Sequence, residues 1–252
     1  MFKLVCNLKL LNYIIKMESF NKNIINKENN KENNTENNTE NNIEDEEKEY
    51  KILSIDVGII HLGISVSILN EDFTLKEIIW VDNIDITKYK HKKCNVNQCK
   101  LYHTKTFYDW IEHTIQENIE HFEGSDMIII EKQPPQGFVV IEQLIFSKYR
   151  NKTTIISPQS VHKYLNFFDL DYEKRKELSV KISDKYLSEN LIQKTKTFDR
   201  RHDISDSICM MLYFINKKNI EYKKLQRYNS LKRDINVLNA IEKLERFRYN
   251  KS

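Results

Sequence analysis

Two short apolar runs that each end in a carboxylate constrain this chain more than any other feature. Residues 51–66, KILSIDVGIIHLGISV, have the pattern of a buried strand, a tight turn and a second strand. Asp56 stands near the end of the first strand, where a plain strand would carry another apolar residue. Residues 127–131, MIIIE, form another all-apolar strand, and it ends in Glu131. Two acids at the ends of buried strands indicate a shared site at one edge of a sheet.

Strands and helices alternate along the chain after Tyr50. Because such alternation is typical of layered α/β proteins, we expect an α/β fold. The predicted strands are 51–57, 62–70, 74–83, the run ending at residue 131, and TTIISP at 153–158. The predicted helices are 104–122, 138–149, 173–190, 203–217 and 231–247.

Composition divides the chain into three parts. Residues 1–49 are predicted to be a disordered leader, because their Asn/Glu-rich part contains too little apolar surface to fold. Residues 50–220 are the predicted folded domain, and residues 221–252 are a basic amphipathic helical tail. The net charge of +3 is uneven, since residues 21–50 carry four lysines against nine acids. The folded part is therefore basic, which suits a polyanionic partner.

The cysteine content and the length of the apolar runs constrain the cellular location of the protein. Four cysteines are too few for a disulfide scaffold of this size, so an intracellular, reducing environment is expected. No apolar run approaches the roughly 20 residues of a membrane span, so no membrane partner is expected. Residues 1–16 are basic, apolar and free of acids, which is compatible with a mitochondrial presequence or with a disordered leader.

A second pair of acids lies in RHDISDSICMMLYF. Asp203 and Asp206 are three residues apart at the start of a predicted helix, so they share one face. If this helix packs at the sheet edge, they join Asp56 and Glu131 in one pocket. Four clustered carboxylates need a counter-charge, and oxygen ligands of this kind suit Mg²⁺ or Mn²⁺.

Each acid also has a simpler interpretation. Asp56 is close to a glycine and could shape a turn. Glu131 could be a solvated strand end. Asp203 could cap a helix and Asp206 could favour its first turn electrostatically. Only the joint placement of all four favours a metal site.

The order of several motifs resembles one family. ILSIDVGIIHLGISV, IIIEKQP, ISPQSV, KRKELSV and HDISDS are similar to segments of the poxvirus-type Holliday junction resolvases, in the RuvC-like branch of the ribonuclease H superfamily. The resemblance spans about residues 51–217. It implies a ribonuclease H-like mixed five-stranded sheet flanked by helices, and a homodimeric, Mg²⁺-dependent endonuclease that resolves four-way DNA junctions by paired nicks. It also suggests a viral replication site in the host cytoplasm or, alternatively, a mitochondrion.

The same resemblance implies site residues. Two Mg²⁺ ions per site, replaceable by Mn²⁺, would be held by four carboxylates: Asp56, Glu131, Asp203 and Asp206. A functional lysine of the family matches Lys176, with Lys174 as the alternative. Basic side chains that flank the expected cleavage pocket are predicted to contact DNA: Lys174, Arg175, Lys176, Arg200 and Arg201. Phe138 could stack on a base or lie in the core.

A compact Cys/His set could hold structural Zn²⁺. The spacing H-x2-C-x4-C-x3-H supplies two imidazoles and two thiolates: His91, Cys94, Cys99 and His103. The gaps match no standard zinc finger, so a loop with free thiols is the alternative.

Other functions fit parts of the sequence. DVGIIHLG resembles the first phosphate loop of actin-like ATPases, but the four glycines of the chain form no later glycine-rich element for a nucleotide. A nuclease of the same fold that acts on other branched DNA or on RNA–DNA hybrid remains open. So does a non-catalytic junction-binding module, although four retained acids argue against it.

Overall fold

The computed structural model describes residues 48–90 and 106–249, with side chains as far as residue 237. The strands are β1 (Tyr50–Val57), β2 (His61–Leu69), β3 (Leu75–Asp85), β4 (Met127–Glu131) and β5 (Thr153–Ile156). The helices are η2 (Ile86–Lys90), α2 (Phe107–Glu117), α3 (Ile119–Gly124), α4 (Val139–Lys148), α5 (Pro158–Tyr164), α6 (Tyr172–Ser183), α7 (Glu189–Lys196) and α8 (Arg201–Tyr249). No helix in this part of the chain is both long and apolar enough to span a bilayer.

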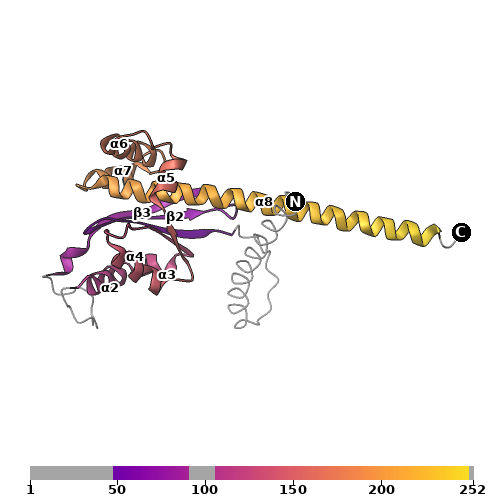
Figure 1. Cartoon of the computed structure of the whole chain (residues 1–252), viewed down its shortest axis with the longest axis horizontal. Helices are drawn as coiled ribbons and strands as arrows, with labels where there is room; N and C mark the ends of the chain where they lie inside the picture. Colours follow the sequence, from indigo (N-terminus) through magenta and orange to yellow (C-terminus); the bar gives the residue numbers. More distant parts are fainter. Residues whose placement is uncertain (1–47, 91–105, 250–252) are drawn as a thin grey trace. The chain divides into compact units, whose positions relative to one another are not determined.

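The five strands form one mixed sheet in the order β3-β2-β1-β4-β5. The first three strands form an antiparallel meander. β4 lies parallel to β1, and β5 lies parallel to β4. Helices cover both faces, with α2, α3 and α4 on one side and α5 to α8 on the other (Figure 1). The mixed five-stranded sheet flanked by helices that the sequence predicts is confirmed.

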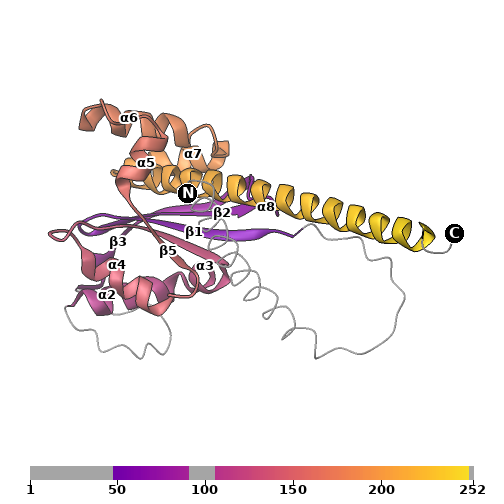
Figure 2. The same cartoon turned by 45° about the vertical axis from the view of Figure 1, so that its right-hand side comes forward.

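The period-two alternation of the strands creates two hydrophobic cores. Leu53 and Ile55 of β1 pack in the core beneath α2 and α4. Ile52 of the same strand packs in the other core, against the first half of α8. Figure 2 shows both helical layers against the sheet. Even-numbered residues of β1 therefore face α8, and Asp56 belongs to this set.

Several helix boundaries differ from those predicted. The helix expected over 104–122 is interrupted at Asn118, whose side-chain amide donates to the Thr114 carbonyl at 2.8 Å. The helix expected over 173–190 is two helices, because a turn after Ser183 leads to a new helix capped by Ser188. α5 was not predicted, although proline at its first position favours a helix start.

α8 is continuous, whereas the sequence predicted separate helices at 203–217 and 231–247. The apolar periodicity stops between these two segments, but residues 217–230 contain neither glycine nor proline. Lys, Glu, Gln, Leu and Arg propagate a helix without an apolar face. The predicted domain boundary at residue 220 thus falls inside one helix.

Candidate functional site

The strand register brings the first two acids together. β1 and β4 are parallel, with Ile55 paired to Ile130, so Asp56 and Glu131 follow side by side at the same ends of adjacent strands. Ile129 packs in the core on the α8 side, and Glu131, two residues later, faces the same way. Both carboxylates therefore point to the layer that contains α8.

Small residues let the start of α8 approach the sheet closely. Ser54 Oγ on β1 donates to the Ser207 carbonyl at 2.6 Å, and Ser207 Oγ donates to Ser65 Oγ at 3.1 Å. A Cβ atom added at Gly63 would lie 2.2 Å from the carbonyl carbon of Asp203. The helix therefore rests directly on β2 at the strand position that pairs with Asp56.

One pocket of about 310 Å³ contains all four acids. Its lining combines these carboxylates with basic and aromatic side chains, of which the main members are Asp56, Glu131, Asp203, Asp206, Arg175, Lys176, Arg200, His202, Phe167 and Tyr172. Acids 150 residues apart in the chain thus share one cavity.

Asp203 already has cationic and polar partners. Arg200 donates from Nε to Oδ2 at 2.7 Å and from Nη2 to Oδ1 at 3.2 Å. His202 Nε2 lies 3.0 Å from Oδ1, and the Asn83 amide donates to Oδ2 at 3.3 Å. Within the described ranges, no three His, Cys, Asp or Glu side chains are already arranged to hold a metal ion. Coordination by Asp203 would therefore require at least one of these partners to move.

The other three acids resist ionisation. Burial, reinforced by Glu131, Asp206 and Asp203, raises the pKa of Asp56 well above its ordinary value. Burial also raises the pKa of Glu131. The pKa of Asp206 rises to about 7, chiefly through burial, with Glu131 and Asp203 adding to the effect and a hydrogen bond from Ser179 opposing it. Asp56 shares a hydrogen bond with Glu131, as expected when one of two adjacent carboxyl groups keeps its proton.

These shifts predict how stability depends on pH without metal. A carboxyl whose pKa is higher in the folded than in the unfolded state binds more protons when folded, so the free energy of unfolding falls as pH rises between the two pKa values. For Asp206 this window runs from 3.8 to about 7. In EDTA, we expect the Tm of Asp206→Asn to exceed that of the wild type increasingly as pH is raised from about 4 to about 7, and the difference to level off above pH 7. Thermal unfolding followed by circular dichroism measures the difference.

A matched variant isolates this effect. The partly buried His121, His162 and His202 have lowered pKa values, mainly through desolvation, and give the opposite pH slope, so only the difference between variant and wild type is informative. Glu177→Gln removes an exposed acid on α6 and should leave the wild-type profile unchanged. Parallel profiles for wild type and Asp206→Asn would contradict the assignment.

Glu131 is held by a chain of hydrogen bonds that the sequence did not reveal. Gln133 Nε2 donates to Glu131 Oε2 at 2.8 Å. The backbone amide of Gln133 donates to Glu142 Oε2 on α4 at 2.6 Å. The Glu-x-Gln-Pro motif thus orients the acid from the opposite helical layer. Glu142 gave no sequence signal, because an acid in a first helical turn is common.

The predicted basic residues separate into two groups. Arg175, Lys176 and Arg200 line the pocket, and Lys176 Nζ lies 2.8 Å from His202 Nε2. Lys174, the alternative to Lys176, pairs instead with Asp171 at 2.9 Å and lies outside the pocket lining.

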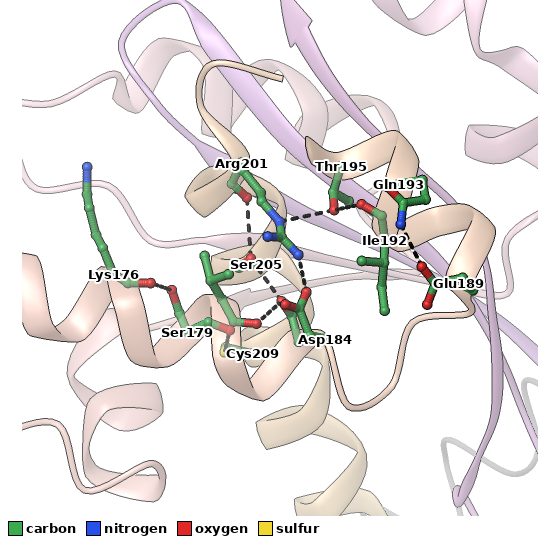
Figure 3. Close-up of polar contacts among 12 residues, drawn as sticks. Lys176, Ser179, Asp184, Glu189, Ile192, Gln193, Thr195, Arg201, Ser205 and Cys209 are labelled. Carbon is green, nitrogen blue, oxygen red and sulfur yellow. Dashed lines mark hydrogen bonds and ion pairs between the residues drawn. The ribbon is translucent and has the colours of Figure 1, made fainter. Parts of the chain in front are cut away.

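Arg201 anchors helices instead of lining the pocket. It forms an ion pair with Asp184 and donates to Thr195 Oγ1 at 3.1 Å. Figure 3 shows Arg201 directed to these partners, while the Lys176 ammonium extends away from them. Beside them, Ser183 Oγ on α6 donates to Ser205 Oγ on α8 at 2.9 Å. These contacts fix α6 and α7 against α8, so Arg201 has a structural role in the described contacts.

Two other predictions have different outcomes. Phe138 packs partly buried against the core beneath α4, with its ring centroid 5.7 Å from that of Phe107, so it has the core role. The zinc set lies at residues 91–103, outside the described residues, and stays a prediction.

The residues of the pocket fit a divalent cation. Oxygen donors from Asp56, Glu131, Asp203 and Asp206 are the hard ligands that Mg²⁺ prefers. A cation would also offset burial, the main cause of the raised pKa values of three of these acids, and the like-charge repulsion that adds to it. These residues could therefore hold Mg²⁺, with Lys176, Arg175 and Arg200 at the same cavity to face an anion.

Comparisons with known proteins give only structural matches. No protein-family model matches the sequence, and no curated protein does. Among solved structures, the fold is similar to the Fowlpox virus resolvase in complex with its substrate Holliday junction DNA, at 17% identity and a TM-score of 0.49, covering 66% of this chain and 97% of that one. The yeast mitochondrial Holliday junction resolvase matches at 16% identity and a TM-score of 0.49, and the match covers 70% of this chain and 83% of that one. RuvC from Thermus thermophilus matches at 13% identity and a TM-score of 0.41, and the match covers 65% of this chain and 92% of that one.

Proposed function

We propose that this protein is a Mg²⁺-dependent endonuclease that resolves four-way DNA junctions by paired nicks. The observation that carries the proposal is the convergence of four carboxylates with Lys176, Arg175 and Arg200 on one pocket. Acids alone would favour a metal site, and basic groups alone would favour an anion site. Both at one cavity are what hydrolysis of a phosphodiester requires.

Different residues of the pocket would bind the metal ions and the DNA. Asp56, Glu131, Asp203 and Asp206 would hold two Mg²⁺ ions, or Mn²⁺ in their place. Bound Mg²⁺ supplies activation of the attacking water and stabilisation of the departing 3′ oxygen, which leaves a 5′ phosphate. Arg175 and Arg200 neutralise the DNA backbone around the cut. Gln133 keeps the Glu131 carboxylate oriented to the cavity.

Lys176 is positioned to neutralise the scissile phosphate. Its ammonium is held between His202 at 2.8 Å and the Tyr172 ring, whose centroid lies 4.1 Å away. α6 carries it to the pocket because Ser179 and Ser183, one and two turns later, are buried against α8.

Replacing Lys176 by Ala is expected to slow single-turnover cleavage on the order of 100-fold, the usual effect of losing one donor to developing negative charge. Lys174→Ala is the matched control, since it removes the same charge two residues away from a solvated position. Rates measured with excess enzyme on a labelled junction test this. Equal rates for both variants would remove Lys176 from the site.

The function itself is tested with three DNA substrates. The full-length protein is incubated with a synthetic four-way junction, a linear duplex and an RNA–DNA hybrid, with and without Mg²⁺. We expect paired, symmetric nicks in the junction only when Mg²⁺ is present. Tight junction binding without cleavage would instead identify a binding module, and preferential cutting of the hybrid would identify a related nuclease.

Paired nicks need two active sites, so we further propose that the protein acts as a homodimer. A two-fold axis places identical sites on opposite strands of a junction. Light scattering of the purified protein measures the oligomeric state.

A further inference from the structure

Large aromatic side chains are exposed beside the pocket, on the segment that joins α5 to α6. Phe168 is 61% exposed, and Tyr172 is 55% exposed. Tyr172 lines the pocket, as does Phe167, the residue before Phe168. A single exposed aromatic side chain needs no explanation, but two of them on a segment that also lines a charged pocket mark a candidate binding surface.

The backbone of this segment holds Phe168 outward. Asn166 adopts a left-handed conformation with φ of 58° and turns the chain sharply after α5. The amide of the next residue, Phe167, then donates to the His162 carbonyl at 2.8 Å, and its ring is buried. At the other end, Asp171 caps α6 by accepting from the Lys174 amide at 2.9 Å. Phe168 is therefore displayed from a turn fixed on both sides.

The surrounding charges identify the partner. Arg175 and Lys176, on the first turns of α6, line the same pocket as Tyr172 and would contact the phosphate backbone. Nucleic acids combine phosphates with flat apolar bases, and aromatic side chains next to basic grooves stack on such bases. A base paired and stacked in duplex DNA has no free face, whereas a base at a branch point can expose one.

We propose that Phe168 is a stacking platform for an unstacked nucleobase next to the scissile phosphate. This inference rests on the proposed function and gives it a source of selectivity for branched DNA over duplex. The carboxylates and Lys176 could act on any phosphodiester. A stacking platform strengthens binding only to DNA that has an unstacked base.

Binding measurements on the full-length protein test the platform. Phe168→Ala is expected to weaken junction affinity about tenfold without Mg²⁺, within the range for losing one stacked base, and to leave linear-duplex affinity unchanged. Phe168→Trp should restore junction affinity. Tyr108→Ala, which removes a 54% exposed ring on α2 at the opposite face of the sheet, should have no effect.

A double-mutant cycle that combines Phe168→Ala with abasic DNA distinguishes base stacking by Phe168 from a structural role of this side chain. Abasic sites are placed in turn at the nucleotides that flank the branch point. One position should weaken wild-type binding about as much as Phe168→Ala does, with no further loss when both changes are combined. Wild-type affinity in Phe168→Ala, or additive losses at every position, would overturn the platform while leaving junction cleavage standing. A wild-type protein that does not bind junctions would overturn the proposed function together with it.

Discussion

Replacement of Glu131 by Gln is expected to lower junction cleavage by more than about 100-fold, since even changes to residues that merely support metal ligands cost roughly 10- to 100-fold. Glu131 lies beside Asp56 and is oriented by Gln133, so the amide would keep the local hydrogen bond but lose the charge that holds a cation. Junction binding without Mg²⁺ should persist or tighten, because one negative charge near the DNA phosphates disappears. Gel-shift and single-turnover assays measure the two properties separately.

Asp203→Asn is expected to lower junction cleavage by the same factor, but it also changes the contacts of Arg200. Asp203 accepts from both Nε and Nη2 of Arg200, so the amide would lose the charge and one of these two hydrogen bonds and would hold this guanidinium less firmly. Glu177→Gln, an exposed neutralisation on α6, is the control for both variants and should cut like the wild type. Cleavage at a wild-type rate by Glu131→Gln or Asp203→Asn would exclude that residue from the metal site.

The positions of the acids could be predicted because each depends on local periodicity. An apolar run that ends in an acid fixes the strand end, and spacing of three residues fixes the common face of Asp203 and Asp206. What the sequence could not supply was the order of the strands. The resemblance to a known family implied only a mixed five-stranded sheet, which the structure confirms, and the structure shows that β1 and β4 are neighbours in it.

The partners of these acids could not be predicted, because they depend on contacts between distant elements. Asn83 reaches Asp203 from β3, and Glu142 reaches Gln133 from α4. The sequence matched the functional lysine to Lys176 but left Lys174 as the alternative, and the packing of α6 on α8 shows that Lys176 lines the pocket. Similarly, Arg200 and Arg201 are adjacent, but α8 directs one to Asp203 and the other to Asp184.

Gly63→Ala is expected to lower the rate of cleavage on the order of 100-fold while the protein still folds. The added Cβ would lie 2.2 Å from the carbonyl carbon and oxygen of Asp203, and backbone atoms cannot rotate away. The start of α8 must therefore move outward and carry Asp203 and Asp206 with it. A displacement of about 1 Å in such a site can cost 100-fold in rate. Overpacking of this kind also costs about 1–3 kcal/mol of stability, or several degrees of Tm.

Gly124→Ala is the matched control for this change. Neither glycine has a positive φ, so alanine strains the backbone at neither position. At Gly124 the nearest atom to an added Cβ is the flexible Lys51 Nζ at 3.6 Å, so cleavage should match the wild type, and the Tm should be equal or slightly higher because alanine favours the helix. Circular dichroism at 20 °C distinguishes a displaced active site from unfolding, since Gly63→Ala should keep its secondary structure while its cleavage rate falls. If Gly63→Ala cuts junctions at the wild-type rate, the close contact between β2 and α8 does not position the acids, and the described pocket is not the site of cleavage.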